Sequence, residues 1–495
     1  MRLHELAGAI LLKQVIGSMK TEVFGITSDS RQVKEGDLFV AFRGEHVDAH
    51  RFVGQAAERG AVAALVEEPV AVAITQLVVP STRRIAPFVA HRLLGDPTAF
   101  MTMVGVTGTN GKTTTTMLLE RILIQAGRDV GLIGTIAQRT SRGDLRESSM
   151  TTPESVELAK VLKEMRDLGM NTVVMEVSSH ALELHRVAGI PFRVAVFTNL
   201  TQDHLDFHAS MEAYGAAKGK MFGRLGNAFV PLADGGVPVA VLNADDAWSA
   251  RYAQDTVQQV VTYGIREPAD VRATEVAIRA DGASFALQSF AGEAHVRLRM
   301  TGRFSVYNAL AAIAASLALG VPLDVIVRAL EVVAGVPGRF ERVEAGQSFT
   351  VLVDYSHTPD SLENALTTIA EFCEGRIITV VGCGGDRDRT KRPLMAGIAT
   401  KYSDFTVLTS DNPRTEDPEA IIDDMEAGLG ADVRDRYTRI VQREAGIQDA
   451  IARARPGDVI LIAGKGHETY QIVGTVKHDF DDRKVAASII KSLNG

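Results

Sequence analysis

The stretch Gly105-Val-Thr-Gly-Thr-Asn-Gly-Lys-Thr-Thr114 decides the fold class. The apolar, β-branched run at 102–106 predicts a buried strand, and residues 112–126 have the pattern of a helix. A glycine-rich turn between a strand and a helix directs backbone N–H groups inward and forms an anion site. The stretch therefore predicts a phosphate-binding loop in an α/β domain, with Lys112 reaching the β- and γ-phosphates and Thr113 holding Mg²⁺.

The glycines of this loop do not follow the commonest spacing. The general motif G-x-x-x-x-G-K-[ST] requires glycine at position 106, where this chain has Val106, and the glycines stand at 105, 108 and 111 instead. The sequence therefore predicts a variant loop, unlike that of the commonest GTPases. A glycine-rich turn that binds no ligand is the alternative interpretation.

Length and composition predict an enzyme-like protein of several domains. The 495 residues predict three domains at about 150 residues each. The chain is 46% hydrophobic with a formal net charge of −8, so neither disorder nor bulk attraction to nucleic acid or anionic lipid is expected. No apolar run approaches the roughly 20 residues that span a bilayer, and no signal peptide is expected. Two cysteines indicate a reducing compartment.

Short apolar runs alternate with helical patterns along the chain, which predicts parallel sheets covered by helices. Boundaries near Pro97 and in the turn at 335–339 predict domains over 1–98, 99–337 and 338–495. A long helix is expected from about 305 to 319. Further strands are predicted at 37–42, 61–66, 171–177, 194–198, 350–354, 377–382, 406–409 and 459–463.

Three segments of the predicted central domain carry candidate metal ligands. Glu176 follows a predicted strand, where a carboxylate can hold magnesium beside a phosphate loop. His204 lies in Asn199-Leu-Thr-Gln-Asp-His-Leu-Asp-Phe-His208, and Lys218 lies in Tyr214-Gly-Ala-Ala-Lys-Gly-Lys-Met-Phe222. Chemistry alone favours a structural histidine and solvated lysines at these positions, because Mg²⁺ prefers oxygen ligands.

The loop Thr107-Gly-Thr-Asn-Gly-Lys-Thr-Thr114 resembles the ATP loop of the Mur ligases and their relatives, the folylpolyglutamate synthetases. The resemblance covers nearly the whole chain and implies ATP-dependent formation of an amide bond in bacterial, cytoplasmic peptidoglycan precursor synthesis. It implies an α/β fold of three domains: an N-terminal UDP-binding domain, a central P-loop-type parallel-sheet ATPase domain and a C-terminal Rossmann-like domain.

The resemblance also assigns roles around the nucleotide. It implies a catalytic Lys112, magnesium ligands at Thr113, Glu176 and His204, and a carbamylated Lys218 whose added carboxylate joins this set. Asn308 is expected against the adenine, Arg339 of Gly338-Arg-Phe-Glu341 on the transferring phosphate, and Asp354 on the ribose. The implied ATP-binding residues are Gly108, Thr109, Asn110, Gly111, Lys112, Thr113, Thr114, Asn308, Arg339 and Asp354.

The N-terminal segment Thr27-Ser-Asp-Ser-Arg-Gln-Val-Lys-Glu-Gly-Asp-Leu-Phe-Val-Ala41 resembles that of family members that add the third amino acid of the peptide. The implied substrate is UDP-MurNAc-L-Ala-D-Glu. Its implied contacts are Ser28, Ser30, Glu45, His46, Val47, Thr151, Thr152, Ser178 and Arg186.

The tetrapeptide Asp411-Asn-Pro-Arg414 resembles the signature of family members that add meso-2,6-diaminopimelate. Diaminopimelate carries one carboxylate more than lysine, and a guanidinium can clamp it in bidentate fashion. Arg387 is expected on a carboxylate and Glu468 on an ammonium group. The implied diaminopimelate-binding residues are Arg387, Asp411, Asn412, Pro413, Arg414, Gly464 and Glu468.

Three alternatives stay open at this point. The chain could add L-lysine, it could be a folylpolyglutamate synthetase, or it could be an ATP-dependent regulator that ligates nothing. The second is disfavoured by the N-terminal Asp-Ser-Arg segment, and amino-acid-dependent phosphate release would exclude the third. A monomer is expected.

Overall fold

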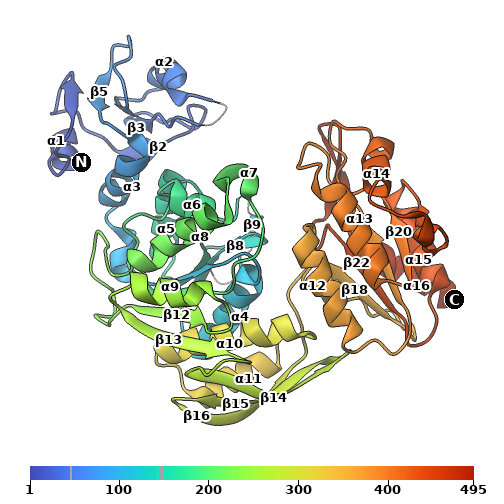
Figure 1. Cartoon of the computed structure of the whole chain (residues 1–495). Coiled ribbons are helices and arrows are strands. Elements are labelled where there is room, and N and C mark those ends of the chain that lie inside the picture. The colour runs from blue at the N-terminus through green and yellow to red at the C-terminus, as the bar shows by residue number, and fades with distance from the viewer. Residues whose placement is uncertain (45–46, 142, 145, 148–149, 495) are drawn as a thin grey trace.

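The computed structural model describes residues 1–44, 47–141, 143–144, 146–147 and 150–494. It has three α/β units, each built around its own sheet (Figure 1). The N-terminal unit lies at one end of the central unit, and the C-terminal unit lies beside it (Figure 1). The predicted three-part α/β architecture is therefore confirmed, whereas the boundaries after residues 98 and 337 stay predictions.

The N-terminal sheet has five strands in the order β1-β5-β4-β3-β2. Strands β2 to β5 are parallel, and β1 pairs antiparallel with β5. The expected strands at 37–42 and 61–66 are present but shorter. The elements are α1 (Leu3–Ala7), β1 (Gln14–Ile16), β2 (Gly25–Thr27), β3 (Asp37–Val40), η1 (Ala49–Phe52), α2 (Val53–Glu58), β4 (Ala63–Val66), β5 (Thr75–Val78), α3 (Thr82–Leu93) and η2 (Pro97–Phe100).

The central sheet has eleven strands in the order β16-β15-β14-β13-β12-β11-β6-β10-β7-β8-β9. Its strands are β6 (Thr102–Thr107), β7 (Val130–Ile133), β8 (Ala137–Arg139), β9 (Arg146–Glu147), β10 (Thr172–Glu176), β11 (Phe192–Phe197), β12 (Val239–Asn243), β13 (Gln259–Gly264), β14 (Val271–Arg279), β15 (Gly282–Ser289) and β16 (Gly292–Leu298). Its helices are α4 (Lys112–Gln125), α5 (Ser155–Asp167), α6 (Ser179–Glu183), α7 (Leu205–His208), α8 (Met211–Gly223), α9 (Trp248–Asp255), α10 (Arg303–Ala318) and α11 (Leu323–Glu331).

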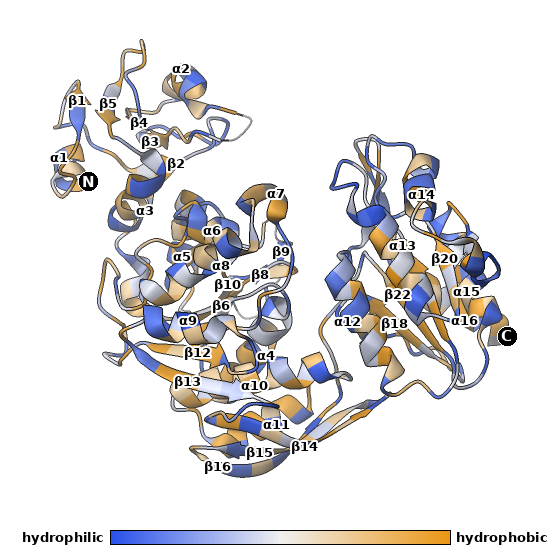
Figure 2. Cartoon of the chain, in the orientation of Figure 1, coloured by the Kyte–Doolittle hydropathy of each residue, from blue (hydrophilic) through white to orange (hydrophobic). Residues whose placement is uncertain are grey.

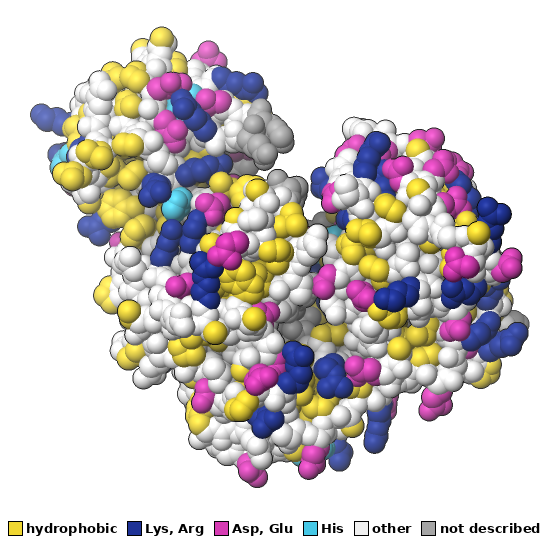
Figure 3. Space-filling view, in the orientation of Figure 1, with side chains coloured by type: hydrophobic (Ala, Val, Ile, Leu, Met, Phe, Trp, Pro, Cys, Tyr) yellow, Lys and Arg dark blue, Asp and Glu magenta, His cyan; other side chains and the backbone are white. Residues whose placement is uncertain are grey.

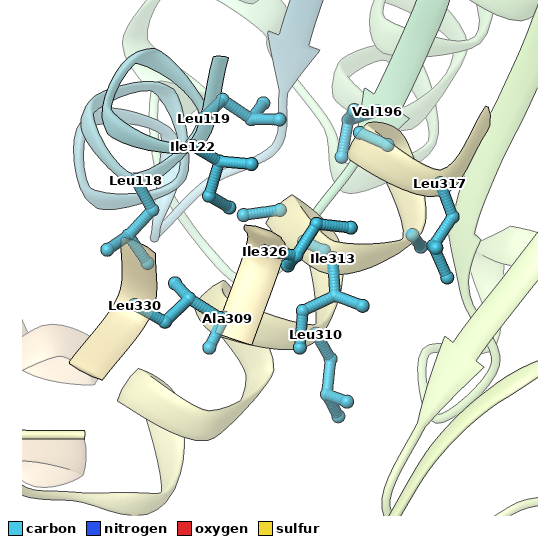
Figure 4. Packing of buried hydrophobic residues seen from close by; sticks show 14 of the residues in the cluster. Leu118, Leu119, Ile122, Val196, Ala309, Leu310, Ile313, Leu317, Ile326 and Leu330 are labelled. Carbon is cyan, nitrogen blue, oxygen red and sulfur yellow. The ribbon is translucent and has the colours of Figure 1, made fainter. Parts of the chain in front are cut away.

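Alternate residues of β6 enter different hydrophobic cores, as the two-residue period of a strand requires. Val104 and Val106 pack with α4, α10 and α11, whereas Met103 packs with α5, α8 and α9. Figure 4 shows the first core, where Leu119 and Ile122 of α4 lie near Ile313 of α10. Apolar residues are concentrated in the strands of the sheets (Figure 2). This packing fixes the carboxyl end of β6, and with it the phosphate loop.

The central sheet departs from the expected parallel arrangement at its margins. Strands β14, β15 and β16 pair antiparallel, as do β7, β8 and β9. Two residues separate β14 from β15, and two separate β15 from β16. Such short connections only allow antiparallel hairpins, because a parallel return needs a crossover of about a dozen residues.

The C-terminal sheet has six strands in the order β17-β18-β22-β19-β20-β21, and β18 to β21 run parallel in it. The expected strands at 350–354 and 459–463 match β18 and β22. The strands are β17 (Glu341–Arg342), β18 (Thr350–Asp354), β19 (Ile377–Val381), β20 (Phe405–Leu408), β21 (Tyr437–Arg439), β22 (Val459–Ala463) and the separate hairpin β23 (Tyr470–Val473) and β24 (Val476–Asp479). The helices are α12 (Pro359–Ala370), α13 (Lys391–Tyr402), α14 (Pro418–Glu426), η3 (Ala431–Arg436), α15 (Arg443–Arg453) and α16 (Asp482–Asn494). Across the described residues, no helix has both the length and the apolar character that crossing a membrane requires.

Candidate functional site: a cleft between the central and C-terminal units

A cleft of about 650 Å³ lies between the central and C-terminal units. Figure 3 shows the furrow that separates the two units on one face of the molecule. The phosphate loop and Glu176 line the cleft from the central unit, and Arg339 and Asp354 line it from the C-terminal side. The sheets therefore bring together residues that lie up to about half the chain apart in sequence.

The phosphate loop has the geometry expected from its glycines. Gly108 has φ +147° and Gly111 has φ +85°, values that residues other than glycine rarely adopt. A Cβ at Gly108 would lie 1.9 Å from Thr198 Oγ1, and one at Gly111 would lie 2.3 Å from Asn308 Oδ1. Gly111 caps α4 without a side chain, so the first backbone N–H groups of the helix are left for an anion.

Lys112 and Lys218 both point to the phosphate loop. Lys112 Nζ donates to the carbonyls of Gly108, at 2.9 Å, and Thr109, at 2.7 Å. Lys218 Nζ donates to the Gly108 carbonyl at 2.8 Å and lies 4.5 Å from the centre of the Tyr214 ring. Burial, reinforced by the charge of Lys112, holds the pKa of Lys218 well below its usual value. A lysine buried in this way favours the uncharged amine, which is the form that reacts with carbon dioxide.

Glu176 is buried at the carboxyl end of β10, as the sequence predicted. Its carboxylate accepts hydrogen bonds from the backbone N–H of Thr135, at 2.8 Å, and from the Thr135 hydroxyl, at 3.0 Å. Thr135 follows β7, which neighbours β10 in the sheet. Thr135 was not predicted from the sequence, although its position after a strand that pairs with β10 could have indicated it.

His204 lies before α7 with φ +54°, and 41% of its side chain is exposed. Its Nε2 is 3.4 Å from Asp203 Oδ2, and burial lowers its pKa to about 4 despite that carboxylate. The ring is therefore neutral at neutral pH, and a neutral imidazole is the form that binds a metal. Asp203, which also lines the cleft, was not singled out from the sequence.

The expected magnesium donors share this cleft. Thr113, Glu176, His204 and Lys218 all line it, and they supply a hydroxyl, a carboxylate, an imidazole and an amine. Within the described ranges, no group of three or more His, Cys, Asp or Glu side chains could hold a metal by itself. The set fits Mg²⁺ when nucleotide oxygens and a carbamate on Lys218 complete it, since a free amine is not an oxygen ligand.

The residues expected on the sugar-peptide substrate also meet near Glu176. The Thr152 hydroxyl donates to the Glu176 carbonyl at 2.9 Å and accepts from the Ser178 N–H at 3.1 Å. Arg186 donates to the Thr152 carbonyl at 3.0 Å, and the Thr151 and Thr135 hydroxyls are 3.0 Å apart. Thr151 and Ser178 face the cleft itself.

The remaining sugar-nucleotide residues belong to the N-terminal unit. Ser28 and Ser30 follow β2, and the Ser30 hydroxyl donates to Gln55 Oε1 at 2.7 Å. Val47 is exposed. Glu45 and His46 lie outside the described residues.

Arg339 connects the two sides of the cleft. Its Nη2 lies 3.5 Å from Thr113 Oγ1, and its guanidinium lies 4.7 Å from the centre of the Tyr355 ring. Its Nε is buried without a hydrogen-bond partner among the described atoms. Asp354 Oδ2 accepts from the Phe340 N–H at 2.8 Å, which ties the Arg339 segment to β18. Asn308, buried on α10, lines the nucleotide side.

The residues predicted for the incoming amino acid cluster at the carboxyl ends of β19, β20 and β22. Asn412 Nδ2 donates to Glu468 Oε2 at 2.8 Å, and Lys465 Nζ donates to the same oxygen at 3.0 Å. A Cβ at Gly464, where φ is +111°, would lie 2.4 Å from Asp411 Oδ2. Lys465, fully buried, was not predicted as a site residue, because sequence does not reveal that its charge is enclosed.

The two predicted guanidinium groups come from neighbouring loops. Arg414 Nη1 donates to the Gly385 carbonyl at 2.8 Å, and a Cβ at Gly385 would lie 1.9 Å from the Pro413 carbonyl oxygen. Arg387 is exposed and donates to the Asp386 carbonyl at 3.2 Å. The seven predicted diaminopimelate residues thus lie in adjoining loops of one unit, and their roles stay predictions.

Three family profiles match the chain in succession. They are described as "Mur ligase family, catalytic domain" over residues 22–91, "Mur ligase middle domain" over 106–316, and "Mur ligase, glutamate ligase domain" over 338–466. Together they follow the three units in order.

Curated relatives match over nearly the full length. The UDP-N-acetylmuramoyl-L-alanyl-D-glutamate--2,6-diaminopimelate ligase of Bacillus cereus is 46% identical over 490 residues, covering 99% of this chain and 98% of its own. The protein of the same name from Geobacillus thermodenitrificans is 50% identical over 472 residues, covering 95% of each chain.

Solved structures also resemble this chain. A structure of a UDP-N-acetylmuramoyl-L-alanyl-D-glutamate--2,6-diaminopimelate ligase superposes with a TM-score of 0.71 and 32% identity, over 100% of this chain and 99% of that one. MurF ligase from Thermotoga maritima, solved in complex with ADP, shares the fold with a TM-score of 0.63 at 20% identity, over 96% of each chain.

Proposed function

Because this chain belongs to the Mur ligase family, we propose that it joins meso-2,6-diaminopimelate to UDP-MurNAc-L-Ala-D-Glu at the expense of ATP. The product would be the UDP-MurNAc-tripeptide of peptidoglycan precursor synthesis, made in the cytoplasm by a monomer. One observation carries the proposal: the unit that closes the other side of the phosphate-loop cleft also holds Arg387, Arg414 and Glu468 in adjoining loops. Two guanidinium groups and a carboxylate match an amino acid with two carboxylates and ammonium groups.

The reaction proceeds through an acyl phosphate. The γ-phosphoryl group of ATP passes to the side-chain carboxylate of the D-glutamyl residue, and ADP remains. The amine of diaminopimelate then attacks the acyl carbon, and phosphate leaves from the tetrahedral intermediate. In this sequence Lys112 and the N-terminus of α4 hold the nucleotide phosphates, and Arg339 offsets charge on the transferring group.

Bound Mg²⁺ would supply charge neutralisation between the phosphates and the acceptor carboxylate. Thr113, Glu176, His204 and a carbamylated Lys218 are the residues that would hold it. The depressed pKa of Lys218 supports the modification, because the uncharged amine is its reactant. Thr135 keeps the Glu176 carboxylate oriented through its two hydrogen bonds.

The C-terminal unit would determine whether diaminopimelate or lysine is accepted. Arg414 points back to the Gly385 carbonyl, so its guanidinium is already oriented before an amino acid arrives. A second carboxylate on the substrate would be bound by this group, and lysine would leave it unpaired. A site built for a charged partner rejects analogues that lack it.

A parallel assay tests the proposal. The purified protein is incubated with ATP, Mg²⁺ and UDP-MurNAc-L-Ala-D-Glu, with meso-diaminopimelate or L-lysine added separately, and phosphate release and product mass are measured. We expect turnover and the tripeptide mass with diaminopimelate. Turnover with lysine alone would retain the ligase and reject the selectivity, and absence of turnover with both would reject the proposed reaction.

A further inference from the structure

The carboxylate of Glu416 joins the loop that carries Arg414 to the loop that carries Arg387. Its Oε1 accepts from the backbone N–H of Asp386, at 2.6 Å, and from Arg392 Nη2, at 2.8 Å. Its Oε2 accepts from Arg389 Nη2, at 2.7 Å, and from Arg392 Nη1, at 3.0 Å. Glu416 therefore helps to fix the loop at 384–389 against the loop at 411–416, together with Arg414, whose Nη1 donates to the Gly385 carbonyl.

Breaking the contacts of Glu416 between the two loops (the junction) costs free energy because Arg392 is buried there. Arg392 is the second residue of α13, only 1% of its side chain is exposed, and it pairs with Glu416 and with Asp424 of α14. Its Nη2 also lies 3.3 Å from the Gly384 carbonyl. Asp424 is 44% exposed, so Glu416, at 14%, is the more enclosed of the two carboxylates that balance this buried charge.

Both loops hold a residue in an unfavourable backbone conformation at this junction. Asp386, next to Arg387, has φ +52°, and Arg414 has φ +50°. Neither is glycine, so the surrounding contacts must maintain both conformations. Glu416 holds the N–H of Asp386, and the Asp386 carboxylate in turn accepts from the N–H of Thr415, at 3.2 Å, and from its hydroxyl, at 2.7 Å.

We propose that Glu416 is the positioning residue that sets the separation of Arg387 and Arg414 and thereby determines which amino acid the C-terminal unit accepts. Its contacts in the structure are to Asp386, Arg389 and Arg392 rather than to the cleft, so it acts through the two loops and touches no reacting atom. The proposal rests on the proposed function and adds a specificity determinant to it.

The test compares Glu416→Gln with Glu419→Gln. Both remove one carboxylate, but Glu419 is 56% exposed and pairs with Arg439 on the outer surface. For Glu416→Gln we expect the KM for meso-diaminopimelate to rise roughly 10-fold, with kcat and the KM for ATP within about twofold. Its preference for diaminopimelate over L-lysine should fall by a similar factor. Glu419→Gln should match the wild type in kcat, in both KM values and in the preference for diaminopimelate.

A second variant keeps the test decisive if Glu416→Gln does not fold. Thr415→Val removes only the hydroxyl that donates to Asp386, and leaves Arg392 paired. We expect it to raise the KM for diaminopimelate roughly threefold, in the same direction. An unchanged KM and unchanged selectivity in the variants, or equal losses for both amino acids through kcat alone, would overturn the proposal.

The wild type assayed in the same series separates the two proposals. Selective turnover by the wild type with unaltered selectivity in the variants would overturn the role of Glu416 alone. Failure of the wild type to use either amino acid would overturn the proposed function and the role of Glu416 with it.

Discussion

The phosphate loop and the loops that carry Arg387, Arg414 and Glu468 (the amino-acid loops) arrange their charges differently. In the phosphate loop, Lys112 and Lys218 donate to backbone carbonyls, and no ion pair to either is found among the described residues. In the amino-acid loops, Lys465 is paired with Glu468, and Arg392 is paired with Glu416 and Asp424. The two lysines of the first region have no acidic partner in the described part of the chain, whereas the second region combines paired charges with Arg387 and Arg414, which donate to backbone carbonyls.

This difference separates charges that can bind a substrate anion from charges that hold neighbouring loops in place. Lys112 donates only to carbonyls, so no ion-paired carboxylate competes with an incoming polyphosphate for it. A buried arginine that is paired on both sides attracts little, but it fixes the geometry of the loops beside it. We therefore expect substitutions in the first region to reduce turnover, and substitutions in the second to change selectivity.

The largest effect is expected at Lys112. Lys112→Met removes the cation nearest to the loop carbonyls while it retains a similar length, and kcat should fall roughly 10³-fold. Single-turnover formation of ADP measures the loss at the phosphoryl-transfer step. A variant with normal ADP formation would contradict the role of the phosphate loop.

Lys218 and Lys220 give a matched pair on one helix. Lys218 is fully buried against the Gly108 carbonyl, whereas Lys220 is half-buried and pairs with Glu183. Lys218→Gln should reduce kcat roughly 100-fold, and Lys220→Gln should stay within about twofold. Mass measurement of the intact wild type with and without bicarbonate tests the carbamate directly. Equal kinetics of the two variants would contradict the assignment.

Arg414 should affect selectivity more than rate. Arg414→Gln removes the guanidinium expected to clamp the second carboxylate, worth about 1.5–3 kcal/mol as a charged hydrogen bond. The ratio of kcat/KM for diaminopimelate to that for lysine should fall roughly 10- to 100-fold. A uniform loss for both amino acids would place Arg414 outside the discrimination.

The smallest effect is expected in stability against pH. Arg392 and the other donors hold the pKa of Glu416 at about 2, below its ordinary 4.5. A lowered native pKa contributes stability above pH 4.5, and that contribution is lost as the pH falls from 4.5 towards 2. The thermal unfolding midpoints of the wild type and Glu416→Gln should differ at neutral pH and converge in acid. A constant difference down to pH 2 would contradict this assignment.

The phosphate-loop side could be predicted closely from sequence. Strand, turn and helix are contiguous there, so local pattern alone placed Lys112 at the start of the helix, and it placed Glu176 at the end of a strand. The antiparallel strands β14 to β16 were missed, because none of the strands expected from the sequence fell within 271–298. Thr135 was missed because strand order, rather than chain order, brings it to Glu176.

The amino-acid side could be predicted only as separate motifs. The tetrapeptide that ends in Arg414 was recognised, yet the junction that holds it depends on Arg392, Glu416 and Asp386, which three different segments contribute. Exposed and buried arginines are alike in sequence. Tertiary packing alone distinguishes Arg387, which is exposed, from Arg392, which is enclosed.

The most direct test of the central claim is a competition in one reaction. The wild type is given ATP, Mg²⁺ and UDP-MurNAc-L-Ala-D-Glu with equal concentrations of meso-diaminopimelate and L-lysine, and the mass of the UDP-linked product is determined. We expect the diaminopimelate product to dominate. A product that contains lysine in comparable or greater amount would contradict the selective role of the loops that carry Arg387 and Arg414.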